Sequence, residues 1–230
     1  MRTQKPDPML DALLDAAIAH VPFDGWSPTA FSAAVGDIGI DPAHAKTICP
    51  RGSADLAVAY HLRGDAQMAA ALVDADLTDM RFRDRVVHAI KLRLADADKE
   101  IVRRGSSLFA LPHMAPEGAK LIWGTADAIW NALGDTSNDV NWYTKRATLS
   151  AVYGSVVLYW LGDDGTGVDD FIDRRIENIM QFEKAKAKAN KNNALKPFTR
   201  LLTSLTSTIK APARTPKTDL PGIWREGADQ

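Results

Sequence analysis

The stretch LLDAAIAHVPFDGWSPTAFSAAVGDIGIDPAHAKTICPRGSADLAVAYHL, residues 13–62, decides the fold class. Its apolar residues recur at spacings of three and four, the period of a helix that buries one face. Proline and glycine interrupt this pattern and predict short helices joined by tight turns, with breaks at Pro22, Gly25, Gly39 and Pro50. We expect three aromatic side chains to pack the small core of this unit: Phe23, Trp26 and Phe31.

The same helical spacing continues along the rest of the chain. No segment shows the sustained alternation of a strand, and no Asn-Gly hairpin signal occurs. The sequence therefore predicts an all-α protein, with further breaks at Gly105, Pro112, Gly134 and the Gly162–Gly167 turn. The expected helices cover residues 8–20, 27–36, 41–48, 53–75, 79–104, 117–133, 139–161, 168–190 and 194–210.

The composition is that of a globular chain. Hydrophobic residues make up 46% of the 230 residues, which suffices for a sizeable core. The single cysteine, Cys49, excludes a disulfide framework and fits a reducing compartment. No run of about 18 apolar residues occurs, so we expect any membrane contact to be peripheral. The opening residues lack the apolar stretch of a signal peptide, which predicts an unprocessed or already mature chain.

The net charge of -1 is unevenly distributed. From Lys184 to the end, ten Lys and Arg residues stand against three acidic residues, so an acidic body carries a basic C-terminal segment. This layout predicts an anionic partner, either nucleic acid or anionic lipid.

The order of helices and turns in residues 13–62 resembles the N-terminal helix-turn-helix of the TetR regulators. That resemblance implies a TetR-like helical bundle. The charges argue against DNA binding, because four aspartates between Asp24 and Tyr60 outnumber Lys46 and Arg51. The candidate recognition segment DPAHAKTICP also lacks the Arg, Asn or Gln that makes bidentate base contacts. We therefore predict no nucleic-acid partner, with a TetR-type regulator of a hydrophobic ligand as the alternative.

Sequence motifs of catalysis are missing. The chain has no GxSxG, P-loop, GxGxxG or HExxH motif, and no Glu-x-x-His pair of the kind that di-iron oxygenases use. Its five histidines are scattered, and the acidic stretch GDDGTGVDD (162–170) lacks the calcium-loop pattern and reads as a turn that caps the next helix. We therefore expect no enzyme, no metal site and no cofactor.

The segment GDTSNDVNWYTKR, residues 134–146, resembles a ubiquinone biosynthesis protein family, and VPFDGWS (21–27) and FIDRRIENIM (171–180) agree in order and spacing. The resemblance covers about residues 20–190, with Val140 at a position where the family often has a bulky aromatic. It implies a TetR-like fold, lipid binding and assistance to the di-iron demethoxyubiquinone hydroxylase. An isoprenoid lipid and this hydroxylase are therefore the expected partners.

Two expected helices carry the apolar surface that a lipid cavity needs. The second half of helix 139–161 is apolar nearly all round, so we expect it to be buried on more than one side. Two interpretations remain compatible, a plain core helix and a helix that also forms a homodimer interface and a cavity wall. The resemblance favours a lipid site built from Leu121, Ile122, Thr125, Trp130, Leu149, Tyr153 and Val156.

A Trp-Tyr pair at the start of helix 139–161 has the composition of a protein-contact hot spot. The family resemblance implies that this surface, with an aliphatic residue of the preceding helix, docks the hydroxylase. The alternative is that the tryptophan only packs the helix pair while the arginine forms a salt bridge. The predicted partner-binding residues are Ile129, Asp139, Asn141, Trp142, Tyr143 and Arg146.

Residues 194–210, ALKPFTRLLTSLTSTIK, predict an amphipathic helix. At 100° per residue the apolar side chains fall within an arc of roughly 120°, opposite a basic and hydroxyl-rich face. Binding to an anionic membrane surface is the favoured interpretation, and folding back onto the protein is the alternative. The predicted membrane-binding residues are Leu195, Phe198, Arg200, Leu201, Leu202, Leu205 and Ile209.

Together these features predict four regions: a degenerate helix-turn-helix-like unit (1–60), a lipid-binding and dimerisation body (61–190), an amphipathic membrane helix (191–212) and a tail (213–230). The predicted function is a non-catalytic accessory factor that presents isoprenoid quinone intermediates to the hydroxylase. We expect it on the cytoplasmic or mitochondrial matrix side, peripheral on the inner membrane.

Overall fold

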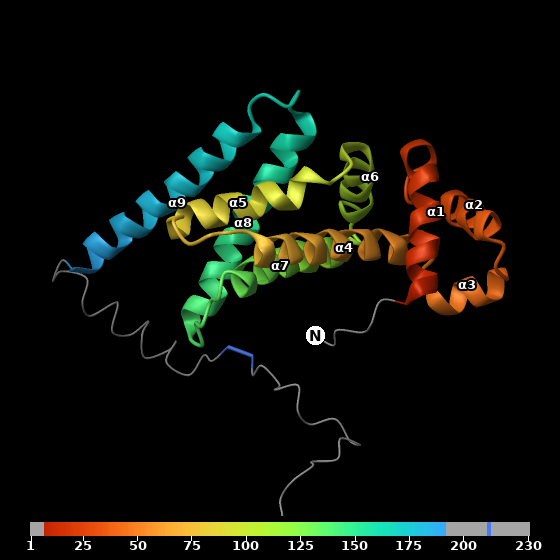
Figure 1. Ribbon diagram of the computed structural model, residues 1–230, viewed down its shortest axis with the longest axis horizontal. Coiled ribbons are helices and arrows are strands. Elements are labelled where there is room, and N and C mark those ends of the chain that lie inside the picture. The colour runs from red at the N-terminus through yellow and green to blue at the C-terminus, as the bar shows by residue number, and fades with distance from the viewer. Residues whose placement is uncertain (1–6, 192–210, 213–230) are drawn as a thin grey trace, which may run out of the picture.

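The computed structural model describes residues 7–191 and 211–212, and every regular element in this part of the chain is a helix (Figure 1). The all-α prediction is therefore confirmed. The helices are α1 (Pro8–Asp24), α2 (Pro28–Ile38), α3 (Pro42–Ile48), α4 (Ser53–Asp74), α5 (Phe82–Ala95), α6 (Lys99–Phe109), α7 (Ala115–Ala132), α8 (Val140–Gly162) and α9 (Val168–Lys191).

The three N-terminal helices begin at side chains that cap them. Asp7, Ser27 and Asp41 each accept a hydrogen bond from a backbone N–H of the first turn, and a proline follows each of them. These caps satisfy N–H groups that have no partner inside the helix, and proline lacks an N–H that would need one. Gly39 ends α2 in the left-handed conformation, at φ 67°.

Two hydrophobic cores lie at opposite ends of the long helix α4 (Figure 1). The first core joins α1, α2 and α3 to the start of α4 and to Ile101 of α6. The second joins the C-terminal half of α4 to α5, α7, α8 and α9. Because α4 and α6 take part in the packing of the first unit, that unit is held directly against the helices of the body.

The predicted helix 79–104 is wrong, because two helices occupy this region. α5 ends at Ala95, and the carboxylate of Asp98 accepts a hydrogen bond from the backbone N–H of Ile101 at 3.0 Å to start α6. Capping by Asp98 outweighs the continuous helical spacing on which the prediction rested. The breaks predicted at Gly105 and Pro22 are also wrong, since these residues lie inside α6 and α1.

One of the three aromatic residues assigned to the N-terminal core lies outside it. Trp26 and Phe31 are buried as predicted, and the Trp26 ring tilts against Tyr60 with centroids 6.0 Å apart. Phe23 is 84% exposed, so its assignment to the core is corrected. It lies in the last turn of α1 beyond Val21, which is the last buried residue of that helix.

Residues 194–210 lie outside the described part of the chain, and the amphipathic helix predicted there stays a prediction. Within residues 7–191 and 211–212, no helix is both long and apolar enough to cross a bilayer.

Candidate functional site

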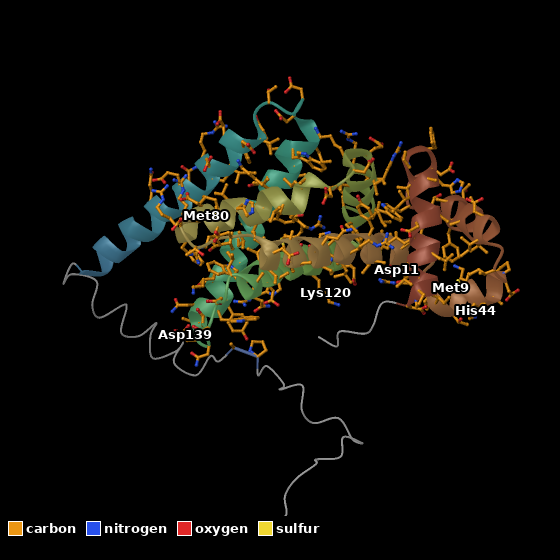
Figure 2. All side chains as sticks on the ribbon, viewed as in Figure 1. Met9, Asp11, His44, Met80, Lys120 and Asp139 are labelled. Atoms are coloured by element: carbon orange, nitrogen blue, oxygen red, sulfur yellow. The ribbon has the colours of Figure 1, made fainter. Side chains whose placement is uncertain are left out.

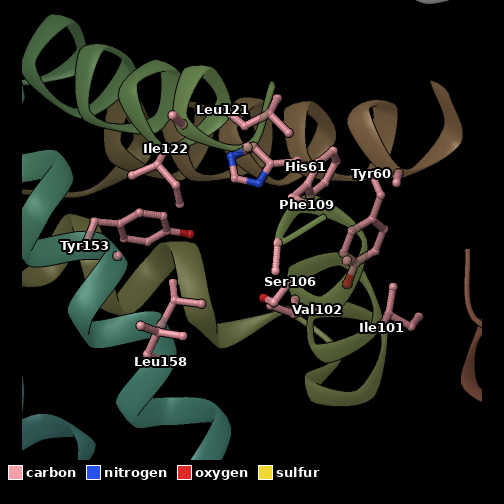
Figure 3. Close-up of a pocket in the computed structure, with 18 of the residues that line it drawn as sticks. Tyr60, His61, Ile101, Val102, Ser106, Phe109, Leu121, Ile122, Tyr153 and Leu158 are labelled. Carbon is pink, nitrogen blue, oxygen red and sulfur yellow. The ribbon is translucent and has the colours of Figure 1, made fainter. Parts of the chain in front are cut away.

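A largely apolar cavity of about 320 Å³ lies among α4, α5, α6, α7 and α8 (Figure 3). Its wall is formed mainly by aliphatic and aromatic side chains, with a few polar groups at one place. Its volume lies at the lower end of the range for small-molecule sites, which are usually apolar with a small number of polar groups that fix orientation. Figure 3 shows side chains of α4, α6, α7 and α8 converging on this space.

The residues predicted to bind lipid fall into three places. Leu121, Ile122 and Tyr153 line the 320 Å³ cavity. Trp130 and Leu149 line a second cavity of about 280 Å³ among α5, α7, α8 and α9. The remaining two are fully buried: Thr125 is hydrogen-bonded beside the first cavity, and Val156 packs in the body core.

Sequence reasoning missed the walls that α4 and α6 contribute. Tyr60 and His61 of α4 and Val102 and Phe109 of α6 line the first cavity together with the α7 and α8 residues (Figure 3). Asp98 could have indicated the α6 wall in the sequence. Because it caps the start of α6, it separates α6 from α5, and α6 then forms a wall of the cavity. Helical periodicity alone could not show that α6 faces α8 across a cavity.

A buried polar cluster adjoins the cavity. The Arg93 guanidinium donates to the Asp65 carboxylate at 2.7 Å and to the His61 carbonyl at 3.0 Å. The Thr125 hydroxyl donates to the same carboxylate at 2.9 Å and lies 2.8 Å from Nε2 of His61. Three helices, α4, α5 and α7, supply these groups, so the cluster exists only in the folded chain.

The hydrogen bonds of this cluster fix the state of His61. The Thr125 hydroxyl has two acceptors besides His61, the Asp65 carboxylate at 2.9 Å and the Leu121 carbonyl at 3.3 Å; with its one proton assigned to these, the Nε2–H of His61 is the donor to the Thr125 oxygen. Burial lowers the pKa of His61 below its ordinary value of 6.5; Asp65 opposes this shift and Arg93 adds to it. His61 is therefore neutral at physiological pH, with Nδ1 as an acceptor.

The depressed pKa of His61 predicts a pH-dependent stability. Below pH 6.5 the unfolded chain binds a proton on this histidine while the folded chain resists it, so the free energy of unfolding should fall as the pH decreases. In His61→Gln this component should be lost, which urea unfolding above and below pH 6.5 can measure. His44→Gln, at an exposed position of α3, is the control and should keep the wild-type slope. Equal slopes for His61→Gln and wild type would contradict the prediction.

A second group of charged residues fastens the loop between α7 and α8. The Asp135 side chain, 3% exposed, accepts hydrogen bonds from Lys145 Nζ at 2.8 Å and from Arg146 Nη1 at 3.0 Å. Arg146 is fully buried and also pairs with Asp127 at 2.5 Å. Burial raises the pKa of Asp135, but hydrogen bonds from Lys145, Ser137 and Arg146 outweigh it and hold this pKa well below its ordinary value.

The predicted partner-binding residues gather at this junction of α7 and α8, but not all of them lie on the surface. Asp139 and Asn141 are exposed, and Figure 2 shows Asp139 at the tip where α7 meets α8. Trp142 and Tyr143 are half-buried, with ring centroids 4.8 Å apart. The other two, Ile129 and Arg146, are fully buried. We call the four accessible residues Asp139, Asn141, Trp142 and Tyr143 the Trp142 surface.

The C-terminal part of the chain returns to the same junction. The backbone N–H of Ala211 donates to the carbonyl oxygen of Asn138 at 3.0 Å, next to Asp139 (Figure 2). The last described residue before the predicted membrane segment, Lys191, ends α9. The first one after it, Ala211, lies beside the Trp142 surface. The seven predicted membrane-binding residues themselves lie outside the described part.

Residues 115–183, which form α7, α8 and much of α9, match the protein family described as COQ9. Over these residues the chain is similar to the COQ9 family. The predicted recognition of a ubiquinone biosynthesis family is confirmed by this match, which contains the cavity residues of α7 and α8 and the whole Trp142 surface.

Curated COQ9 proteins are similar to the chain beyond this region. The human protein named "Ubiquinone biosynthesis protein COQ9, mitochondrial" is 28% identical over 182 residues, which cover 73% of this chain and 56% of that protein. The rat protein of the same name is 30% identical over 182 residues, which cover 73% of this chain and 57% of that protein. The chain thus spans a little over half the length of these relatives.

A solved structure confirms the predicted TetR-like architecture. The TetR transcriptional regulator from Nitrosomonas europaea superposes with a TM-score of 0.61 over 74% of this chain and 97% of that chain. At 18% sequence identity this likeness establishes the fold alone.

Proposed function

We propose that the protein is a non-catalytic accessory factor of ubiquinone biosynthesis that holds an isoprenoid quinone intermediate and presents it to the di-iron demethoxyubiquinone hydroxylase. The observation that carries the proposal is the apolar cavity of about 320 Å³. It is walled in part by α7 and α8, the helices of the COQ9-family region. An apolar wall with few polar groups suits a hydrocarbon chain better than a polar metabolite.

The proposed presentation needs a partner surface and a membrane contact close to the cavity helices. The Trp142 surface lies at the start of α8, and the cavity is lined by residues further along the same helix. We propose that the hydroxylase docks at the Trp142 surface and that a second copy of the chain packs against α8, where Leu158 is 70% exposed. We propose a peripheral place on the inner membrane, on the cytoplasmic or mitochondrial matrix side, and the word mitochondrial in the names of the relatives supports a mitochondrial location.

The membrane part of the proposal is tested with residues 194–210. Leu201→Glu with Leu205→Glu places two negative charges on the predicted apolar face and should abolish co-flotation of the full chain with anionic liposomes. Ser204→Glu with Ser207→Glu adds the same charges to the opposite face and should reduce flotation much less. Equal flotation of the two variants would contradict an apolar-face contact with the membrane.

The alternative function, a TetR-type regulator, has less support from the described residues. Within residues 7–60, the described part of the helix-turn-helix-like unit, both Lys and Arg side chains are already engaged: Lys46 lies over the Phe31 ring at 4.9 Å, and Arg51 pairs with Asp55 at 2.7 Å. DNA binding requires several Lys or Arg side chains that neutralise phosphates. Salt-dependent binding of the protein to duplex DNA would favour the regulator.

A further inference from the structure

The hydroxyl group of Tyr153 has no hydrogen-bond partner among the described residues. The side chain is 2% exposed and lines the cavity, and Figure 3 shows its hydroxyl pointing into the space below His61. Buried hydroxyl groups are nearly always hydrogen-bonded, because leaving one without a partner is unfavourable. Burial raises the pKa of Tyr153 to about 12, so the group stays an O–H donor at physiological pH. The Tyr153 hydroxyl is therefore a hydrogen-bond donor that a ligand in the cavity could pair with.

His61 offers the matching acceptor in the wall of the same space, above the Tyr153 hydroxyl in the view of Figure 3. Its Nε2–H is used by Thr125, and Figure 3 shows the other ring nitrogen directed into the cavity. Because the pKa of His61 is depressed, Nδ1 keeps its lone pair at neutral pH. A donor and an acceptor thus both line one predominantly apolar cavity.

This polar end of the cavity carries no net charge. The positive charge of Arg93 is matched by Asp65, whose carboxylate lies 2.7 Å from Nε of Arg93. His61 and Tyr153 are both neutral, so no cationic group is left over for a phosphate. An anionic head group would lose its hydration here without gaining a compensating charge.

We propose that Tyr153 and His61 bind the head of the ligand, and that they select an uncharged aromatic ring bearing a hydroxyl group, a phenol or a hydroquinone. The ligand hydroxyl donates to Nδ1 of His61, and a ligand oxygen accepts from the Tyr153 hydroxyl. A quinone carbonyl oxygen accepts the hydrogen bond from Tyr153, but it has no proton for His61 and would place its lone pair against the lone pair of Nδ1. The reduced head group is therefore preferred over the oxidised one. This inference rests on the proposed lipid-holding function and assigns its head-group selectivity.

The test compares probes that share a decyl tail and differ in the head. Binding to the full chain can be followed by native mass spectrometry and by the change in tryptophan fluorescence, to which Trp26 at the cavity wall contributes. The probes are para-decylphenol, decylbenzene, decylhydroquinone, decylquinone and decyl phosphate. We expect para-decylphenol to bind more tightly than decylbenzene, decylhydroquinone more tightly than decylquinone, and decyl phosphate most weakly.

Tyr153→Phe isolates the hydroxyl group. Loss of one hydrogen bond should lower the affinity for para-decylphenol by about 5-fold and leave the affinity for decylbenzene unchanged. The variant should unfold at the same or a higher temperature than wild type, because the removed hydroxyl has no partner in the described residues. Tyr159→Phe removes a hydroxyl from the same helix at a residue that does not line the cavity, and its affinities should match those of wild type.

The possible outcomes separate this inference from the function on which it rests. If decylbenzene binds as tightly as para-decylphenol and Tyr153→Phe changes neither, the head-group site is overturned while the apolar cavity stands. Tight binding of decyl phosphate, a preference for decylquinone, or a lower unfolding temperature of Tyr153→Phe would also overturn it. If none of the probes binds, the lipid-holding function itself fails.

Discussion

Asp135→Asn should lower the free energy of unfolding by about 3–5 kcal/mol, the range seen when one partner of a buried ion pair is removed. The Asp135 side chain is 3% exposed and accepts from both Lys145 and Arg146. Arg146 would remain fully buried with Asp127 as its only ionic partner among the described residues, and Asp127 is itself 37% exposed. A neutral amide cannot replace the lost charge.

Urea unfolding at neutral pH measures this effect. Asp164→Asn, in the exposed turn between α8 and α9, makes the same chemical change where the carboxylate accepts hydrogen bonds from Thr166, and it should shift stability by about 0.5 kcal/mol or less. Since hydrogen bonds hold the pKa of Asp135 below 3.8, its contribution is complete above that pH and is lost as the pH falls toward the folded-state pKa. A loss under about 1 kcal/mol for Asp135→Asn would show that the ion pair contributes little.

The helix pattern was predictable because its causes are local. Asp7, Ser27 and Asp41 cap helices in the way their neighbours in sequence indicate, and the boundaries of α2, α3 and α4 fall within two residues of the predicted ones. The exception, Asp98, is also local: an aspartate three residues before Ile101 was available as a cap, but continuous apolar spacing masked it. The error therefore arose because two local patterns, the cap at Asp98 and the continuous apolar spacing, predicted different structures for the same residues.

The candidate site was less predictable because its polar parts come from distant segments. Asp65 and Arg93 are 28 residues apart, and His61 and Thr125 are 64 apart. Periodicity indicates which face of a helix is buried but not which helix covers it, so Trp130 was grouped with Tyr153 although they line different cavities. The same limit placed Ile129 on a partner surface, whereas the structure buries it.

Trp142→Ala should weaken binding to the hydroxylase by about 30-fold or more, the effect of removing an interface hot spot. Two neighbours pack against the indole. The Arg146 guanidinium lies 4.0 Å from the ring centroid, and the Tyr143 ring packs edge-on with its centroid 4.8 Å away. Because Arg146 is itself fixed by Asp127 and Asp135, the half-buried Trp142 ring is held in place before a partner arrives. A pre-organised aromatic loses little conformational entropy on binding.

Calorimetric titration of each variant with the purified hydroxylase measures this affinity, and thermal unfolding of the same samples separates binding from stability. Phe23→Ala removes an exposed aromatic side chain from α1, away from the α7–α8 junction, and should bind like wild type. Trp142→Phe keeps an aromatic ring over Arg146 and should retain part of the affinity. If Trp142→Ala unfolds at a lower temperature yet binds normally, the indole serves only to pack α7 against α8, and the proposed docking surface is wrong. Loss of binding without a matching loss of stability would instead establish contact with the partner, since a purely structural side chain cannot separate the two measurements.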